Sequence, residues 1–362
     1  MRILFLLRSS IHNRMGGAEL QAHYISREFK ERGHEVHFAF DSNKNLQIED
    51  DGIIYHFLHD YGNSFCWLNY FSIGNLLNEI DPDIIYHRCR FAYTGIVANY
   101  AKKKSIKMVY HIALDNDCWK NKVPINKNYI PNLIKEYGGR YGIKNAYAII
   151  AQSRQQQKWL KKNFNRNSIL MPKLFPIPPQ PFKKSIPPIV SWIANIKPVK
   201  QPEIFIKLAE KCQNLNAQFV YVGRLMKGER QKILIENTRK LSNLEYLGEI
   251  PFKKTNELLS ESSIFVNTSL YESYPNTYIQ AWLRETPVVA LHHDPDNLLE
   301  KRKIGFQSSN FEQLVKDVRY LIENGNARRE MGKRARKYAI ETHNIEKIGK
   351  KYIKVFENLM ER

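Results

Sequence analysis

The chain has 362 residues, of which 43% are hydrophobic and 12% aromatic, so it can fold into two domains and is not a disordered polymer. The apolar run Ile3–Leu7 is too short for a signal-peptide core, and no stretch of about 18 apolar residues is available to span a membrane. Residues 101–180 hold 16 Lys and Arg against 3 Asp and Glu, within a net charge of +20, which favours an anionic partner such as nucleic acid, a membrane surface or a phosphorylated substrate.

The first part of the chain has the pattern of a doubly wound α/β domain. Buried strands are expected at 2–7, 35–40, 83–87, 107–111 and 146–153, and helices at 17–32, 94–104 and 155–164. Gly16 and Gly17 lie where the first loop meets the first helix, and the lack of a Cβ there lets a phosphate approach the backbone. A turn that binds no ligand is the alternative interpretation.

The stretch from Trp119 to Lys144 interleaves aromatic and cationic residues, and we expect it to contact a bilayer interface. A solvated surface is the alternative. The four cysteines are scattered without zinc-ligand or disulfide spacing, which indicates reduced thiols in a cytosolic protein. The candidate metal-binding motifs of the sequence are three Asp-x-Asp triplets and His292-His293-Asp294. Because such triplets arise by chance and neighbouring strand residues point to opposite faces, we expect no metal and no cofactor.

Seven of the sixteen prolines lie between Pro172 and Pro188 and predict a stiff connection between domains. We therefore expect a first domain at 1–180, a second at 181–345 and a terminal helix at 346–362. Apolar residues at helical spacing fit a helix that either returns to the first domain or packs on its own. They are Ile345, Ile348, Tyr352, Phe356 and Leu359.

The second domain is also expected to be α/β, with strands at 189–193 and 244–248 and a helix at 202–212. Its central stretch, Ile264 to Leu291, predicts a strand, a loop from Thr268 to Pro275, a helix from Asn276 to Glu285 and a second strand. In a parallel sheet this loop faces the ligand, and the helix start offers free N–H groups. The carboxylate of Glu272 beside those donors suits a nucleotide-sugar.

Two strings in this chain carry a family resemblance. The string Tyr271-Glu272-Ser273-Tyr274-Pro275-Asn276, with Gln280 eight positions after Glu272, resembles the donor-site signature of retaining glycosyltransferases of family 4. Gly16-Gly17-Ala18-Glu19 resembles the opening of the same enzymes. The resemblance implies a GT-B fold, in which two Rossmann-like, doubly wound domains face a central cleft, with the acceptor held by the first domain and the donor by the second.

The resemblance also implies roles for single residues. Glu272 would contact the donor sugar, and Gln280 stands where the family has a glutamate for the ribose. Lys200 fills the place of a phosphate-binding lysine, Asn195 replaces the usual arginine, and Arg224 is a charge at the pocket edge. The remaining donor contacts are Gly16, Gly17, Leu247, Ser273, Tyr274, Pro275, Asn276 and Thr277, and His111 would approach the sugar or acceptor.

The expected function is transfer of a sugar, with retention and without a metal, from a nucleotide-diphospho-sugar to a glycan or lipid-linked acceptor in surface polysaccharide synthesis. Catalysis would rest on Glu272, His111 and Lys200. We expect a cytoplasmic protein at the inner face of an anionic membrane, with no nucleic-acid partner. The alternatives are a basic nucleic-acid-binding protein and an inactive homologue, for which Gln280 and Asn195 are the evidence.

Overall fold

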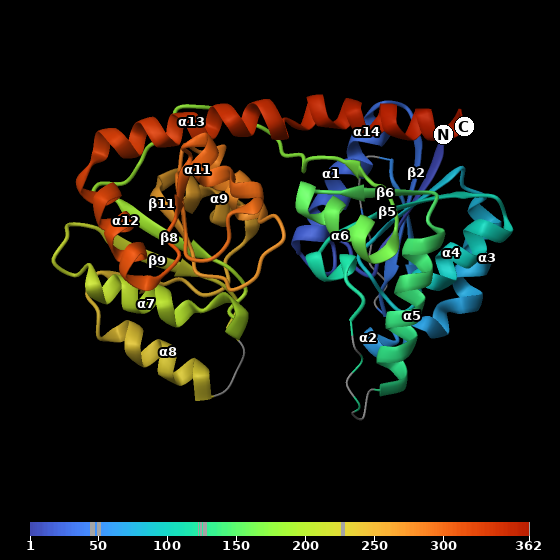
Figure 1. Ribbon diagram of the computed structural model, residues 1–362, viewed down its shortest axis with the longest axis horizontal. Coiled ribbons are helices and arrows are strands. Elements are labelled where there is room, and N and C mark those ends of the chain that lie inside the picture. The colour runs from blue at the N-terminus through green and yellow to red at the C-terminus, as the bar shows by residue number, and fades with distance from the viewer. Residues whose placement is uncertain are drawn as a thin grey trace. The chain divides into compact units, whose positions relative to one another are not determined.

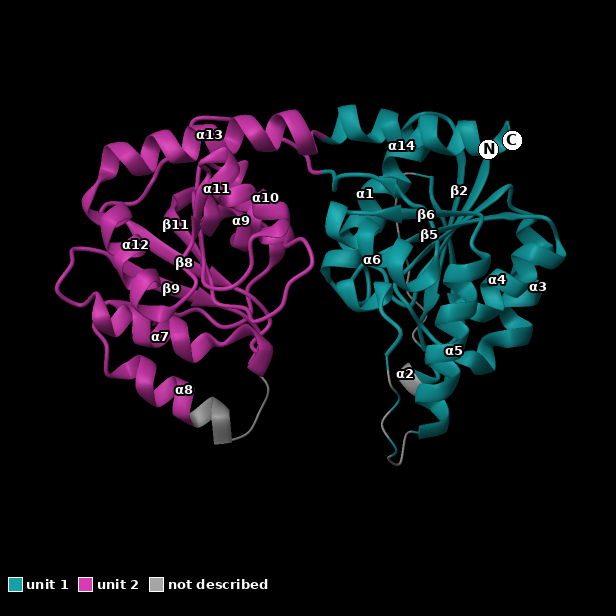
Figure 2. Ribbon diagram, in the orientation of Figure 1, with its two compact units in different colours: residues 1–174, 345–362 teal, residues 175–344 magenta. Residues whose placement is uncertain are grey.

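The computed structural model describes residues 1–43, 48, 52–121, 123, 125, 129–225 and 229–361, so Lys122, Lys127 and Lys227 lie outside the described residues. The chain forms two compact units, which are coloured separately in Figure 2. Unit 1 contains Met1–Leu174 and Ile345–Arg362, and unit 2 contains Phe175–Asn344. The sequence placed this boundary between residues 180 and 181, and the structure places it between 174 and 175.

Unit 1 is built on a seven-stranded parallel sheet in the order β3-β2-β1-β4-β5-β6-β7 (Figure 1). The strands are β1 (Arg2–Leu6), β2 (Glu35–Asp41), β3 (Ile54–Leu58), β4 (Ile84–Arg88), β5 (Lys107–His111), β6 (Ala148–Ala151) and β7 (Ile169–Leu170). The helices are α1 (Gly17–Glu31), α2 (Gly62–Phe65), η1 (Cys66–Asn69), α3 (Tyr70–Ile80), α4 (Thr94–Lys103), η2 (Asp115–Cys118), α5 (Tyr129–Asn145), α6 (Arg154–Phe164) and α14 (Ile345–Met360).

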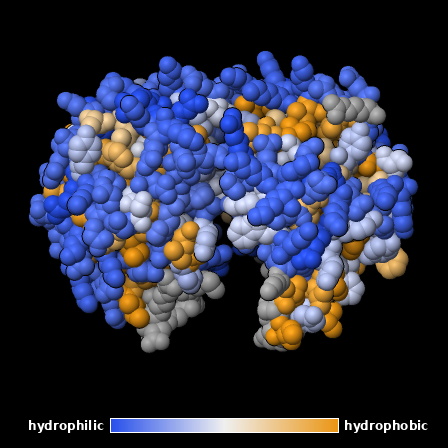
Figure 3. Space-filling view, in the orientation of Figure 1, coloured by the Kyte–Doolittle hydropathy of each residue, from blue (hydrophilic) through white to orange (hydrophobic). Residues whose placement is uncertain are grey.

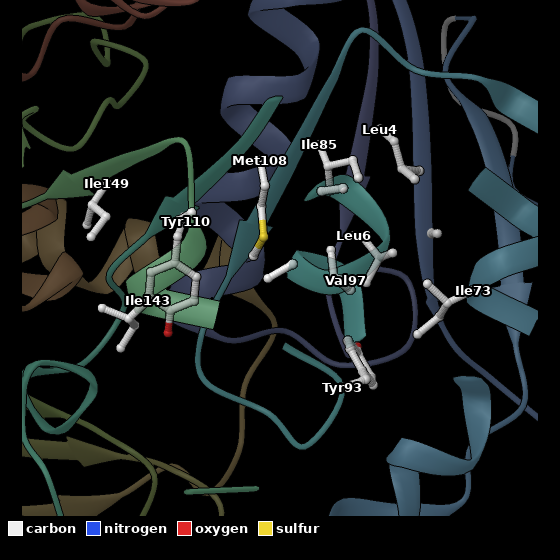
Figure 4. Close-up of a cluster of buried hydrophobic side chains, with 14 of the residues drawn as sticks. Leu4, Leu6, Ile73, Ile85, Tyr93, Val97, Met108, Tyr110, Ile143 and Ile149 are labelled. Carbon is white, nitrogen blue, oxygen red and sulfur yellow. The ribbon is translucent and has the colours of Figure 1, made fainter. Parts of the chain in front are cut away.

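Alternation along these strands sends side chains to both faces of the sheet, so unit 1 has two apolar layers. One layer packs against α3, α4, α5 and α6, and Figure 4 shows Leu4, Ile85 and Met108 of the strands meeting Ile73 and Val97 of the helices. The other layer packs against α1 and α14. The two helical layers therefore lie on opposite faces of one sheet.

The terminal helix α14 belongs to unit 1, although it follows unit 2 in the chain. Its apolar stripe enters the layer beside α1, where the rings of Phe29 and Phe356 have centroids 4.8 Å apart. The Lys107 ammonium also donates to the Leu359 carbonyl at 2.6 Å. Residues 345–362 therefore complete the core of the first unit and not that of the second.

Unit 2 repeats the architecture with a six-stranded parallel sheet in the order β10-β9-β8-β11-β12-β13. The strands are β8 (Ile189–Ile193), β9 (Gln218–Val222), β10 (Leu244–Tyr246), β11 (Ser262–Asn267), β12 (Val288–Ala290) and β13 (Gly305–Gln307). The helices are η3 (Pro198–Lys200), α7 (Pro202–Lys211), α8 (Glu229–Arg239), α9 (Phe252–Glu261), α10 (Asn276–Trp282), η4 (Pro295–Asn297), α11 (Leu298–Arg302), α12 (Phe311–Glu323) and α13 (Gly325–His343).

The helix predicted from Asn276 to Glu285 is shorter in the structure, because α10 ends at Trp282. Glu285 adopts a left-handed conformation with φ 58°, and the Thr286 amide turns back to the Ala281 carbonyl at 3.0 Å. This turn directs the chain into β12. The prediction of an α/β protein made of two doubly wound domains is confirmed by these two parallel sheets.

Candidate functional site

The strand order of unit 2 reverses between β8 and β11, so the chain leaves these neighbouring strands in opposite directions. Parallel sheets bind ligands at such a switch point, outside the carboxyl ends of the strands. The loop after β8 contains Asn195 and Lys200, and the loop after β11 contains Glu272. The topology therefore brings together residues that are more than seventy positions apart in the sequence.

Lys200 and Glu272 form an ion pair at this switch point, between the ammonium Nζ and the carboxylate Oε1. The same oxygen accepts a hydrogen bond from the Ser269 hydroxyl at 2.8 Å and a longer one from the Asn267 amide at 3.4 Å. The Lys200 and Glu272 side chains are 21% and 16% exposed, so the pair is partly buried and still reachable from solvent.

The two loops that carry this pair are tied to each other. The Thr268 hydroxyl accepts a hydrogen bond from the Trp192 indole at 2.9 Å and points its own hydrogen at the carbonyls of Lys200, 2.7 Å away, and Gln201, 2.9 Å away. The Leu270 amide also donates to the Val199 carbonyl at 2.9 Å. These contacts fix the ion pair in place before any ligand binds. The sequence prediction missed Asn267, Thr268 and Ser269, which have the short polar side chains expected after a strand.

A second cation lies near the place where Asn195 replaces the arginine of family 4. The amide of Ile196 donates to the Arg224 carbonyl at 3.1 Å, which brings the loop after β9 beside the loop after β8. Gly223 permits this approach, because its φ is 156° and a Cβ there would collide with the Ala194 carbonyl oxygen. The Arg224 side chain is 74% exposed, with Nε 3.9 Å from Glu249. It is therefore available to an anion.

The other predicted donor residues of unit 2 differ in their accessibility. Gln280 is 4% exposed, and its amide donates to the Asn256 side chain at 3.0 Å, so it is engaged within the protein. Tyr274 is buried, with its hydroxyl 3.2 Å from His343 Nε2. Leu247 is exposed and follows β10. At the junction between this loop and α10, Ser273, Asn276 and Thr277 are half-buried and Pro275 is buried.

The glycine pair Gly16-Gly17 lies in unit 1 at the start of α1, as the sequence indicated. The Glu19 carboxylate folds back over this helix start, where a Cβ on Gly16 would collide with it, and it accepts a hydrogen bond from the Ser9 hydroxyl at 2.5 Å. A carboxylate at a helix N-terminus is electrostatically favourable. A phosphate that binds here would therefore have to displace Glu19.

His111 is 1% exposed and lies in the interior of unit 1, and its contact with the sugar or acceptor stays a prediction. Its Nδ1 is 2.7 Å from the Tyr86 hydroxyl and 2.9 Å from Arg88, and the ring of Tyr352 from α14 packs beside it. Burial, followed by the nearby guanidinium of Arg88, lowers the pKa of His111 well below its ordinary value. The side chain is thus a neutral core residue in this arrangement.

Among the described residues, potential metal ligands do not gather at either sheet edge. Within the part of the chain that the structure describes, three or more His, Cys, Asp or Glu residues do not meet in a geometry that could hold an ion. Asp294, from the triplet Asp294-Pro295-Asp296, instead accepts hydrogen bonds from the Leu299 amide at 2.9 and 3.0 Å at the start of α11.

Two family models match almost all of the chain. Residues 15–170 match the model described as Glycosyltransferase Family 4, and residues 176–338 match the model described as Glycosyl transferases group 1. Among curated proteins, the chain is 26% identical over 177 residues to the poly(ribitol-phosphate) alpha-N-acetylglucosaminyltransferase of Staphylococcus aureus (strain COL). This match covers 47% of the chain and only 35% of the length of that protein.

Solved structures match along the whole chain. Anabaena Alr3699/HepE in complex with UDP has a TM-score of 0.75 at 18% identity, with 99% of this chain and 100% of that chain covered. A TarM variant from S. aureus, in complex with fondaparinux, α-GlcNAc-glycerol and UDP, has a TM-score of 0.79 at 14% identity, with both chains fully covered. At these identities the likeness shows a shared fold of two Rossmann-like units.

Proposed function

Since the chain is a glycosyltransferase of the GT-B fold, we propose that it transfers a sugar, with retention at the anomeric carbon, from a nucleotide-diphospho-sugar to a glycan or lipid-linked acceptor. The observation that carries this proposal is the ion pair between Lys200 and Glu272 at the switch point of unit 2. The pair provides a cation for the diphosphate and, next to it, a carboxylate that accepts hydrogen bonds from the sugar hydroxyls.

When the donor binds, the contact between Lys200 and Glu272 is replaced by contacts of each side chain with the donor. Its diphosphate is anionic, so it is attracted to Lys200 and repelled by Glu272, whereas its sugar hydroxyls donate hydrogen bonds to the carboxylate. Hydrogen bonds to charged groups are the stronger class, at about 1.5–3 kcal/mol each. Glu272 keeps Ser269 and Asn267 as partners after Lys200 has turned to the phosphate, so the carboxylate stays oriented.

The chemical step breaks the bond between the anomeric carbon and the diphosphate oxygen and forms a bond from the same carbon to the acceptor oxygen. The electron pair of the broken bond leaves on the diphosphate, and the acceptor hydroxyl loses its proton. Lys200 offsets the charge that grows on the leaving group, with Arg224 as the second cation in place of the arginine that Asn195 replaces. We propose that these side chains do so without a divalent ion.

Unit 2 is the proposed donor-binding part and unit 1 the proposed acceptor-binding part. Alr3699/HepE and the TarM variant were both solved in complex with UDP, so UDP-sugars are the first donors to test. The curated relative is named for a poly(ribitol-phosphate) acceptor, an anionic polymer, and the cationic excess of residues 101–180 fits an acceptor of that charge. We therefore propose an anionic surface glycan or its lipid-linked precursor as the acceptor.

The test is a thermal-unfolding screen of the purified protein against nucleotide-sugars and free nucleotides. A ligand at about 100 times its dissociation constant stabilises a domain by about 2.7 kcal/mol, which raises the midpoint by several degrees. Lys200→Met should lose most of this rise, and Lys316→Met, an exposed lysine on α12, should keep it. If no nucleotide-sugar raises the midpoint, the proposal fails. Salt-sensitive binding of DNA or RNA would then support the nucleic-acid alternative, and donor binding without transfer would support the inactive homologue.

A further inference from the structure

Helix α5 carries large apolar side chains, of which Ile134 packs partly buried against the core of unit 1, whereas Ile130, Tyr137 and Tyr141 are exposed. Its buried residues are Glu136, Gly139, Gly142 and Ile143. Ile130, Ile134, Tyr137 and Tyr141 follow one another at spacings of four and three residues, so they share one face of the helix. Ile130 is 69% exposed and Tyr137 is 60% exposed. This apolar face has no partner on its outer side among the described residues.

Glycines explain why the bulky residues of α5 are outside. The helix packs on α4 through a seam of small residues, in which a Cβ on Gly138 would meet the Ala92 carbonyl and a Cβ on Gly142 would meet Thr94. Glu136 is buried and forms two ion pairs, with its carboxylate 3.1 Å from Arg90 and 2.7 Å from Arg140. The inner face of α5 is thus filled by backbone contacts, one ion-pair cluster and the buried side chain of Ile143. The exposed side chains Ile130, Tyr137 and Tyr141 therefore lie on the outer face of the helix.

The exposed face of α5 forms one wall of a groove with a volume of about 1160 Å³. The opposite wall comes from η1 and α3, where Leu68 is exposed and Phe71 is 76% exposed. In Figure 3, hydrophobic side chains gather in orange at the end of unit 1 that carries α2 and α5. The apolar and aromatic residues that line the groove include Trp67, Leu68, Phe71, Ile96, Tyr137 and Tyr141.

The charges around this groove have one sign. Lys120, Arg140 and Lys144 line it, and the described residues of its lining include no Asp or Glu. The neighbouring Glu136 is buried and already balanced by two arginines. An apolar floor that contains aromatic rings, surrounded by cations, has the composition of an interfacial membrane contact, with rings at headgroup depth and ammonium groups at lipid phosphates.

We propose that this groove docks unit 1 on the surface of an anionic lipid bilayer. Charge complementarity selects this occupant, because a second copy would place cations against cations, whereas anionic headgroups neutralise them. Nucleic acid fits less well, since Leu68, Phe71 and Ile96 offer its phosphates an apolar floor. The docking is peripheral, since in the described ranges no helix has the length and apolarity needed to cross a bilayer. It does not depend on the donor site of unit 2.

Sedimentation of the full chain with vesicles tests this proposal. The vesicles contain phosphatidylcholine alone or equal parts of phosphatidylcholine and phosphatidylglycerol, at low and at high salt. Binding should appear only with phosphatidylglycerol and weaken as salt rises. Each cation near such a surface contributes about fivefold to binding, so Lys120→Glu with Lys144→Glu should weaken it by at least about 25-fold. Phe71→Ser should weaken it by about tenfold at either salt concentration.

Controls separate docking from general charge and from misfolding. Lys350 and Lys354 are exposed on α14, which packs on the opposite face of the sheet from α3 and α5, so changing both to Glu should have far less effect. Ile233→Ser, an exposed apolar change in unit 2, should have none. Each variant must unfold at the temperature of the parent.

Three results would overturn the proposal. They are equal sedimentation with both kinds of vesicle, no sedimentation with either, and equal losses for the groove and α14 charge variants. Self-association in the absence of lipid that Phe71→Ser abolishes would instead assign the groove to a second copy.

Discussion

Acidification should destabilise unit 1 through His87, a residue that is 0% exposed at the end of β4. Its Nδ1 lies 2.8 Å from the Leu6 carbonyl and therefore carries the hydrogen, while Nε2 lies 2.9 Å from the Thr94 hydroxyl and accepts. The Thr94 oxygen in turn accepts from the Phe91 amide at 2.8 Å at the start of α4. A second proton on the ring would break this chain of hydrogen bonds.

Burial lowers the pKa of His87 from its ordinary value of 6.5 to about 4. The folded state therefore binds this proton more weakly than the unfolded state. The stabilisation is fully present above pH 6.5 and is lost as the pH falls from 6.5 towards about 4. A pKa difference of this size corresponds to about 3 kcal/mol in the free energy of unfolding.

His87→Gln tests this reasoning, because an amide offers one donor group and one acceptor without titrating. Urea unfolding should be followed by circular dichroism at about pH 7 and about pH 4. The parent should lose about 3 kcal/mol more than the variant over this interval, and His59→Gln, at an exposed histidine of the same unit, should behave as the parent. Identical pH dependence of parent and His87→Gln would refute the argument.

Three further changes probe unit 2. Gln280→Glu should bind the nucleotide at least as tightly as the parent by calorimetry if the side chain at position 280 leaves Asn256 for the ribose, because a carboxylate is the stronger acceptor for ribose hydroxyls. Loss of binding in a folded variant would show that position 280 stays with Asn256 and does not hold the ribose. Gly223→Ala should lower the free energy of unfolding in urea by about 2–4 kcal/mol, because residue 223 has a φ of 156° and an added Cβ would collide with the Ala194 carbonyl oxygen. An unchanged urea midpoint would contradict this geometry. A chelator should change the initial rate of transfer by less than about twofold if Lys200 offsets the charge of the leaving group, whereas a rate restored only by added metal would contradict that role.

Strands and helices bounded by clear turn signals, such as α4 and α7, were predicted well from the sequence, whereas helix α5 was not. The apolar runs of β5 and β8 gave the observed bounds Lys107–His111 and Ile189–Ile193. Helix α5 was interpreted only as an interfacial stretch, because three glycines lower its intrinsic helix propensity. The structure shows that these glycines allow close packing on α4, which is information that the local sequence does not contain.

In the candidate site, too, single residues were indicated by the local sequence, whereas their contacts depend on the tertiary structure. The resemblance indicated Lys200 and Glu272 separately, but their ion pair depends on the adjacency of β8 and β11 and on polar residues after β11. The burial of His111 was not predicted, because a position at a strand end does not reveal which layer covers the side chain. The ring that covers it belongs to Tyr352, which follows the whole of unit 2 in the sequence.

The most direct test of the account is the turnover of Glu272→Ala, measured as nucleotide release from the nucleotide-sugar that gives the largest thermal shift. Loss of one charged hydrogen bond to the sugar should lower kcat/KM by roughly ten- to a hundredfold or more, while Glu312→Ala, an exposed acid on α12, should match the parent. Lys200→Met should cause a loss of similar size, and the double variant should lose less than the product of the two single losses, because both residues act on one donor. Unchanged kcat/KM in a folded Glu272→Ala protein would contradict the assignment of this ion pair as the donor site.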